Sequence, residues 1–578
     1  MYTYLKNMEA RMSEDQKDML RRIYEPTVVS TPLMCARRDI CMLPDGEIRS
    51  YGNFYSSHYT GDRGVKGYLS SVDGGISWTK HYTKGRMNSC TYLEKGGIYL
   101  TNCDRHNFDE KYPGLCVFRS TIGPDDPNPE IIHISDESYG CAYLPMQSEF
   151  SDRVWFTAQS ASLVPTFFYS DDLGLTWKKV ELPQPYFYEK IFPHKGMRWS
   201  NDGGTEPYAV ELGKNEMMMI IRTPNDCFYK AYSHDGGETW SEPEASEFYG
   251  TNTTAFLLRL SDGRIVHVWN NTNGLAQLNH KVTKPYPGDG IVKGECENAF
   301  TNRDAAHAAI SDDGGKTFRG FREILLNPVR NNSDFRYVGG GQSGADKSVH
   351  QFQAYELPFN KILVCAGQHE VARRVVIFDL DWLYETSRKE DFLAGVSNLT
   401  THTYTKSVSG CFYAKLGNGH CAWNRTYSAY PMPDPDGGVG EVLGICKRHD
   451  DRLFNDIGGA VWNFPMSRKG RVTVDLKIME KQARFVLTDR WYNTCDPYAG
   501  IQSPFWFELD VTDTGKKFTK VVIDYDVDKG MAEVSLDGEH FFKVAMRNPC
   551  ITGISYLMLQ CATDGDSEGF YVRSMEKE

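Results

Sequence analysis

The chain has 578 residues, of which 40% are apolar and 13% aromatic, and it carries a net charge of −12 with a pI near 5.7. That length is too great for one ordinary hydrophobic core, so we expect one large domain and at least one smaller one. The acidic balance excludes the clustered Lys and Arg that nucleic acid or an anionic membrane requires, so neither is an expected partner.

Residues 1–26 are predicted to form an N-terminal helical segment. Ser13 and Gln16 have the spacing of a capping box, and the segment lacks the apolar core of a signal peptide. No run of about 18 apolar residues occurs anywhere in the chain. As it stands, the sequence predicts a cytoplasmic protein, or a periplasmic or secreted one if a signal peptide has been removed.

One eight-residue pattern, Ser-x-Asp-x-Gly-x-Ser/Thr-aromatic, occurs four times, at residues 71–78, 170–177, 233–240 and 311–318. The Asp is expected to accept N–H groups of a hairpin turn, the Gly to supply a positive φ, and the aromatic ring to pack between neighbouring sheets. This repeat, the Asp-box, predicts an all-β fold with a β-propeller over residues 27–390, which has room for five or six four-stranded blades.

The rest of the chain contains no Asp-box. Residues 391–405 are polar and are predicted to be a linker, and residues 406–578 alternate apolar and polar residues in strand-length runs such as 472–478. This pattern resembles the concanavalin-like β-sandwich, a jelly-roll or lectin-like domain that is often appended to carbohydrate-active enzymes. Whether such a domain binds sugar or only supports the propeller stays open.

The propeller sequence resembles the sialidase (neuraminidase) superfamily of Asp-box glycoside hydrolases, as a divergent member. The resemblance rests on Glu206 in the stretch 205–212, on Arg222 sixteen residues later, and on Arg303 eight residues before the fourth Asp-box. It implies that Glu206 polarises the nucleophile and that Arg222 and Arg303 bind a substrate carboxylate. Guanidinium groups suit that task because their planar donors bind a carboxylate in pairs.

Two further positions follow from the same resemblance. The family's first carboxylate-binding arginine precedes a Leu-Pro-Asp-Gly turn, and here Arg37 and Arg38 both precede such a turn at residues 43–46, with Arg37 preferred. The family's catalytic acid/base is an Asp on a loop before the first Asp-box, which points to Asp62.

The expected nucleophile is where the sequence departs from the family. A Tyr is expected ahead of a late turn, but the matching position is Gln351, or His350 if one residue is inserted. Three explanations stay open: a nearby hydroxyl from Tyr337 or Tyr355, His350 acting as nucleophile or base, or direct attack by water with inversion.

The resemblance implies an exo-glycoside hydrolase that releases a terminal 2-keto-3-deoxy acidic sugar from an oligosaccharide or polysaccharide. The sugar is sialic acid or a related ulosonic acid, such as those of pectin or bacterial polysaccharide. No cofactor and no metal are expected, because His369-Glu370 lacks the second His of a zinc helix. The alternatives are an exo-glycosidase for a neutral sugar on the same propeller and a non-catalytic glycan-binding propeller.

Overall fold

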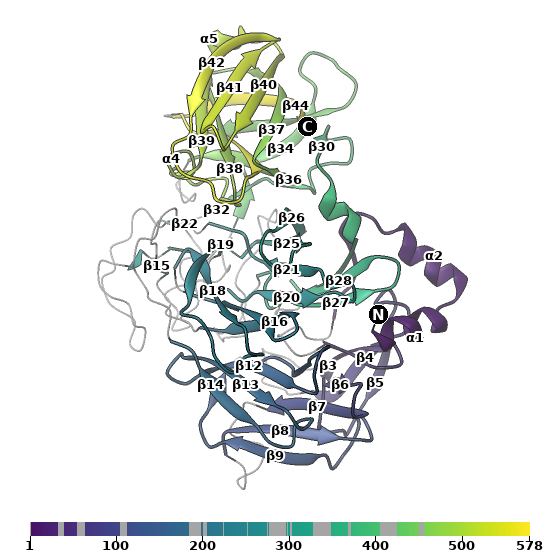
Figure 1. The fold of residues 1–578 in the computed structure, drawn as a ribbon. Helices are drawn as coiled ribbons and strands as arrows, with labels where there is room; N and C mark the ends of the chain where they lie inside the picture. The colour runs from purple at the N-terminus through teal and green to yellow at the C-terminus, as the bar shows by residue number, and fades with distance from the viewer. Residues whose placement is uncertain are drawn as a thin grey trace.

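The structure is a computed structural model. It describes residues 2–32, 40–54, 64–103, 113–140, 142–183, 198–199, 205–223, 225–250, 253–273, 275–276, 296–297, 299–300, 303–327, 348–367, 372–404, 425–449, 456–563 and 565–578. The two parts of the molecule are a ring of small antiparallel sheets and a pair of larger stacked sheets (Figure 1).

Within the described residues, six small sheets form the blades of a β-propeller, so the predicted all-β propeller fold is confirmed. Blades 1 to 3 consist of β2 (Ile40–Met42), β3 (Ile48–Phe54), β4 (Val65–Ser71) and β5 (Thr79–Tyr82); β6 (Thr91–Leu93), β7 (Ile98–Cys103), β8 (Leu115–Ser120) and β9 (Glu130–Ser135); and β10 (Tyr139–Gly140), β11 (Met146–Gln147), β12 (Val154–Ser160), β13 (Pro165–Ser170) and β14 (Lys178–Glu181). Blades 4 to 6 consist of β16 (Pro207–Gly213), β17 (Glu216–Ile221), β18 (Cys227–Ser233) and β19 (Glu244–Tyr249); β20 (Phe256–Arg259), β21 (Ile265–Trp269), β25 (Ala305–Ser311) and β26 (Arg319–Leu326); and β27 (Gln353–Leu357), β28 (Lys361–Ala366), β29 (Arg374–Asp379) and β1 (Thr27–Ser30). Two short pairs lie outside the blades: β15 (Arg198–Trp199) with β23 (Cys296–Glu297), and β22 (Leu275–Ala276) with β24 (Ala299–Phe300).

The ring is closed by a strand from the start of the chain. β1 pairs antiparallel with β29 and completes blade 6, whose other three strands come from the far end of the propeller sequence. The Gln353 amide then links blade 6 to blade 1, because it accepts from Ile40 N at 3.0 Å and donates to Ile40 O at 2.9 Å. Both the backbone and a buried side chain therefore hold the ring shut.

The four Asp-boxes share one hydrogen-bond pattern at the turn between the third and fourth strands of blades 1, 3, 4 and 5. In the fourth box, Asp313 accepts from Ser311 Oγ at 2.8 Å and from Thr317 N at 2.9 Å and Thr317 Oγ1 at 2.6 Å. Partial burial opposes ionisation, but these hydrogen bonds lower the pKa of Asp313 to about 2. The Asp-box residues thus stabilise the hairpin turn, as their sequence pattern predicts.

Two helices of the N-terminal segment cover the outside of blades 6 and 1: α1 (Thr3–Arg11) and α2 (Glu14–Arg22) (Figure 1). The predicted capping box at Ser13 and Gln16 starts α2. Met8 and Leu20 are fully buried in one cluster with core residues of blades 1 and 6. A Cβ at Gly46, whose φ is +84°, would lie 2.5 Å from the Met8 backbone, so this close approach requires glycine.

The stacked sheets form the predicted C-terminal β-sandwich. The larger sheet contains β30 (Arg388–Glu390), β34 (Ala429–Pro433), β35 (Glu441–Lys447), β37 (Lys469–Ile478), β40 (Thr519–Asp526), β41 (Met531–Leu536), β42 (Glu539–Ala545) and β44 (Ser567–Lys577). The smaller sheet contains β31 (Leu399–Thr400), β36 (Gly458–Ser467), β38 (Gln482–Thr488), β39 (Phe505–Asp510) and β43 (Ile554–Cys561). The remaining elements are η2 (Leu380–Tyr384), β32 (His402–Tyr404), β33 (Arg425–Tyr427), α4 (Ala499–Gln502) and α5 (Val511–Thr514).

The sandwich begins earlier in the chain than its sequence pattern predicts. β30 pairs with β44 and β31 pairs with β36, although both strands precede residue 406. Their short length and polar neighbours hid these strands, although Leu399 of β31 is fully buried in the sandwich core. We therefore propose residue 388 rather than 406 as the start of the sandwich, which leaves little of the predicted linker.

The two parts of the chain share a buried polar contact. The Asn271 backbone N–H donates to His307 Nδ1 at 3.1 Å, which leaves the imidazole proton on Nε2, facing the Tyr556 hydroxyl of the sandwich. Tyr556 in turn donates to Glu323 Oε1 at 2.8 Å. Burial lowers the pKa of His307 to about 3, so the imidazole is neutral at ordinary pH. Within the described residues, no helix has the length and apolar character needed to cross a bilayer.

Candidate functional site

Glu206 and Arg222 meet at one end of blade 4. Pro207 pairs with Ile221 across the β16–β17 hairpin, so the residues just outside that pair lie side by side. Arg222 donates to Glu206 Oε2 at 2.6 Å, and the two side chains are only 9% and 5% exposed. The sixteen-residue separation seen in the sequence thus produces a buried ion pair, in which the guanidinium donates a short hydrogen bond to the carboxylate.

Arg303 and His350 lie on neighbouring segments at the corresponding ends of blades 5 and 6. The Arg303 carbonyl accepts from Val349 N at 3.0 Å, and Arg303 is only 2% exposed. His350 is also buried, and its Nδ1 lies 2.6 Å from Ser348 Oγ. Gln351 follows with φ at 63°, a left-handed conformation that a non-glycine residue adopts infrequently. The structure therefore brings Arg303 next to the His350 segment, as it brings Arg222 to Glu206.

Asn270, which sequence reasoning missed, ties these segments together. Its amide donates to Ala305 O at 2.6 Å and to Val349 O at 3.0 Å, and it accepts from Thr253 Oγ1 at 3.0 Å. The side chain is fully buried at the end of β21. The only sequence signal was a polar run, residues 270–273, directly after a buried strand. Asn270 is a positioning residue, because it holds the backbone two residues after Arg303 and one residue before His350.

A sandwich segment reaches this same end of the propeller. Trp491 N donates to Asn271 O at 2.9 Å, and Trp491 O accepts from Asn273 N at 2.7 Å. Arg490 lies over the ring of Tyr249, with 3.0 Å between its guanidinium carbon and the ring centroid. The sandwich is therefore part of the wall around the Arg303 side of the site, which its sequence did not indicate.

Several predicted site residues lie outside the described part of the chain: Arg37, Arg38, Asp62 and Tyr337. Tyr355, the alternative source of a nucleophilic hydroxyl, is described. Its hydroxyl donates to Ile40 O at 2.9 Å, and the residue lines a cavity further along β27 than the segment of His350. Tyr355 therefore serves the contact between blades 6 and 1, and we do not retain it as a nucleophile.

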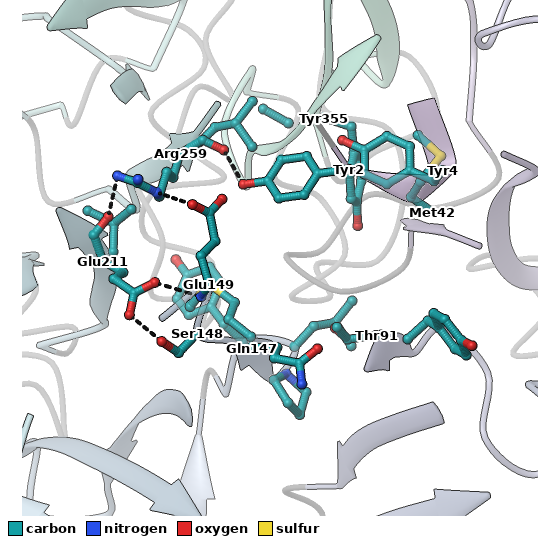
Figure 2. A pocket seen from close by; sticks show the side chains of 18 of the residues that line it. Tyr2, Tyr4, Met42, Thr91, Gln147, Ser148, Glu149, Glu211, Arg259 and Tyr355 are labelled. Carbon is teal, nitrogen blue, oxygen red and sulfur yellow. Dashed lines mark hydrogen bonds and ion pairs between the residues drawn. The ribbon is translucent and has the colours of Figure 1, made fainter. Parts of the chain in front are cut away.

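A cavity of about 490 Å³ lies at the opposite end of the blades (Figure 2). Glu206 stands before β16, whereas Val210 and Glu211, near the end of that strand, line the cavity. Five strand residues at about 3.3 Å each place Glu206 and Glu211 about 16 Å apart. Tyr208 and Gln353 also line the cavity, so it extends from the opposite end of the blades toward the mouth that holds Glu206 and His350.

Comparison with known proteins places the central part of the chain in a family. Residues 140–337 match the model of the BNR repeat-like domain, a range that includes three of the four Asp-boxes. A search of curated proteins finds no match.

Solved structures that resemble the chain include sialidases. The Trypanosoma rangeli sialidase in complex with sialic acid is 12% identical, with 96% of this chain and 94% of that chain covered and a TM-score of 0.35. The NanB sialidase of Streptococcus pneumoniae is 11% identical, with 64% and 73% covered and a TM-score of 0.39. Similarity this loose carries no argument about substrate or chemistry. The part of the chain that is similar to a known family is therefore residues 140–337, which match the BNR repeat-like domain.

Proposed function

We propose that the protein is an exo-glycoside hydrolase that removes a terminal 2-keto-3-deoxy acidic sugar from a glycan. The observation that carries the proposal is the buried Glu206–Arg222 pair at one mouth of the propeller, with Arg303 and His350 on adjacent blades at the same mouth. Buried arginines converging on one opening suit an anionic substrate, because the chain's net charge of −12 otherwise repels anions. The positive charge of these arginines is therefore the reason for proposing an acidic sugar as the substrate.

In this proposal Arg222 has two tasks. A guanidinium has five N–H donors in a fixed plane, so it can hold the Glu206 carboxylate and the substrate carboxylate together. Arg303 supplies a second cation to the same anion. Glu206, kept ionised by Arg222, is placed to stabilise positive charge that develops on the sugar ring as the glycosidic bond breaks.

For the attacking group we propose His350. Its Nδ1 contact with Ser348 orients the ring, and an imidazole can activate water or attack directly. Gln351 at the neighbouring position has no basic group and is assigned no proton transfer. Asp62 remains the proposed acid that protonates the leaving oxygen. Arg37 is the proposed third carboxylate ligand, with Arg38 as its alternative.

The test uses aryl glycosides of sialic acid, its deaminated form and keto-deoxy-octonate, together with neutral aryl glycosides. We expect cleavage of at least one acidic glycoside, and a loss of about a hundredfold or more in kcat/KM for Arg222→Lys and Arg303→Ala. Arg222→Lys keeps the charge opposite Glu206, so a folding defect is not the expected cause of its loss. Arg319→Ala, an exposed arginine on blade 5, is the matched control.

Retained activity in both variants would refute the carboxylate clamp. Cleavage of neutral glycosides alone would favour the neutral-sugar alternative. The anomeric configuration of the first product, followed by NMR, then distinguishes attack by a protein group with net retention from attack by activated water with inversion.

A further inference from the structure

The cavity opposite the Glu206 mouth is enclosed by the inner strands of the blades and by the first residues of the chain. Its lining includes β11, β16, β20 and β27, together with Tyr2 and Tyr4 from the N-terminal segment (Figure 2). A volume of about 490 Å³ lies within the range of small-molecule sites. The space is thus large enough for a sugar of one or two rings.

Aromatic rings form one side of the cavity. The rings of Tyr2 and Tyr4 stack, with centroids 5.6 Å apart and planes 12° apart. Both hydroxyls are anchored to the propeller, because Tyr2 donates to Arg259 O at 3.1 Å and Tyr4 donates to Glu356 O at 3.2 Å. Anchored ring faces of this kind pack against the apolar faces of pyranose rings without losing side-chain freedom on binding.

Carboxylates and one arginine form the other side. Glu211 accepts from Ser148 Oγ at 2.5 Å and from Glu149 N at 3.0 Å. The Arg259 guanidinium donates to Glu149 Oε2 at 3.2 Å and to the carbonyls of Glu211 and Leu212 at 3.4 and 3.0 Å. Because that cation is already neutralised, this wall offers an incoming anion no unmatched positive charge.

Two buried donors on the cavity wall have no hydrogen-bond partner among the described residues: Gln147 Nε2 and Trp155 Nε1. Figure 2 shows the Gln147 side chain at the rim of the cavity, beyond Ser148. A buried N–H without an acceptor costs about 1–3 kcal/mol, so buried donors normally have one. Both N–H groups are covered by neighbouring protein atoms, so a ligand in the cavity would contact the rings and carboxylates rather than these donors.

We propose that this cavity is a second binding site, specific for an uncharged, hydroxyl-rich ligand of the mono- or disaccharide class. Anchored aromatic faces and carboxylate acceptors together match a sugar, whose rings have apolar faces and whose hydroxyls donate. The cations on its lining, Arg259 and Lys95, are paired with Glu149 and Asp152, so among the described residues the site offers an acidic sugar no free counter-charge. Most of the lining comes from turns at the end of the blades opposite Glu206, so the proposal does not depend on the proposed hydrolase function.

The experiment measures binding of lactose and methyl β-D-glucoside by saturation-transfer NMR and calorimetry, with N-acetylneuraminic acid as the anionic comparison. We expect the neutral sugars to bind, and Tyr2→Leu and Tyr4→Leu each to weaken binding about five- to tenfold, because each removes an aromatic ring from the cavity wall while keeping an apolar side chain. Tyr82→Leu is the matched control, since it removes an exposed tyrosine ring that does not line the cavity.

Absence of neutral-sugar binding to the intact protein would overturn the proposal. Binding of equal strength in the two cavity variants would also overturn it and would place the sugar elsewhere, such as on the sandwich. The variants are expected to cleave acidic aryl glycosides at the wild-type rate if the proposed hydrolase function holds, so failure of one proposal is distinguishable from failure of the other.

Discussion

Arg222 and Glu206 combine their proposed role in the site with a structural cost, because both charges are removed from water. Each is held by the other at 2.6 Å, at the point where two strands leave the sheet. The attraction compensates for the lost hydration only while both partners are present. The site is therefore sensitive to single changes and more tolerant of matched ones.

Arg222→Met is expected to lower the free energy of unfolding by about 3–5 kcal/mol, because it leaves the Glu206 carboxylate buried without the charge of Arg222. The double variant Arg222→Met/Glu206→Leu should be less destabilised than the single one. Chemical denaturation of the wild type, both singles and the double measures the coupling. The exposed pair Lys543–Glu533 is the comparison, for which removal of either partner should leave the free energy of unfolding nearly unchanged. A double variant at least as unstable as Arg222→Met would contradict this account.

At the scale of the element, each Asp-box turn depends on one carboxylate. In the first box, Asp73 is only 3% exposed and accepts from Ser71 Oγ at 2.8 Å and from Ser77 N at 2.9 Å. The indole of Trp78 closes the turn by donating to Gly75 O at 2.9 Å. The box is a local unit, which explains why the same pattern recurs in blades of unequal length.

Asp73→Ala is expected to destabilise the propeller by about 2–3 kcal/mol, because several donors of the turn lose an ionised acceptor at once. The fall in Tm, followed by circular dichroism, measures the effect. Asp136→Ala provides the control, since that side chain is 83% exposed and its loss should change stability by about 0.5 kcal/mol or less. Equal shifts in the two variants would argue against the structural role of the box.

These turns also show what the sequence can predict. Each box needs only eight consecutive residues, and the Glu206–Arg222 contact needs only one hairpin, so local patterns reveal both. The pairing of β1 with β29, the hydrogen bonds of Asn270 and the cavity walls join segments far apart in the chain, and no local sequence pattern indicates those contacts. For the same reason the sequence left Tyr355 open as a source of the nucleophilic hydroxyl, because the direction of its side chain depends on the strand that carries it.

At the scale of the whole molecule, His307 sits where the propeller meets the sandwich. Its folded-state pKa of about 3 is below the ordinary value of 6.5, so at intermediate pH the unfolded chain binds a proton that the folded protein excludes. The stability that this group contributes is fully present above pH 6.5. It falls as the pH drops from about 6.5 toward 3.

His307→Gln is therefore expected to flatten the decline of Tm between about pH 6.5 and 4 while lowering Tm at neutral pH, where the contact with Tyr556 is lost. Scanning calorimetry across this pH range tests the expectation. His234→Gln is the control, because His234 is 78% exposed and should leave the pH profile unchanged. A His307→Gln profile parallel to that of the wild type would contradict the argument.

The pairing of β1 with β29 also determines when the propeller can close. During synthesis, residues 27–30 leave the ribosome roughly 345 residues before their partners at 375–377, so blade 6 stays open until nearly all of the propeller sequence has been made. Contacts this distant in sequence form slowly. The growing chain thus carries an unpaired first strand for most of its synthesis, and chaperone dependence should be concentrated in that interval.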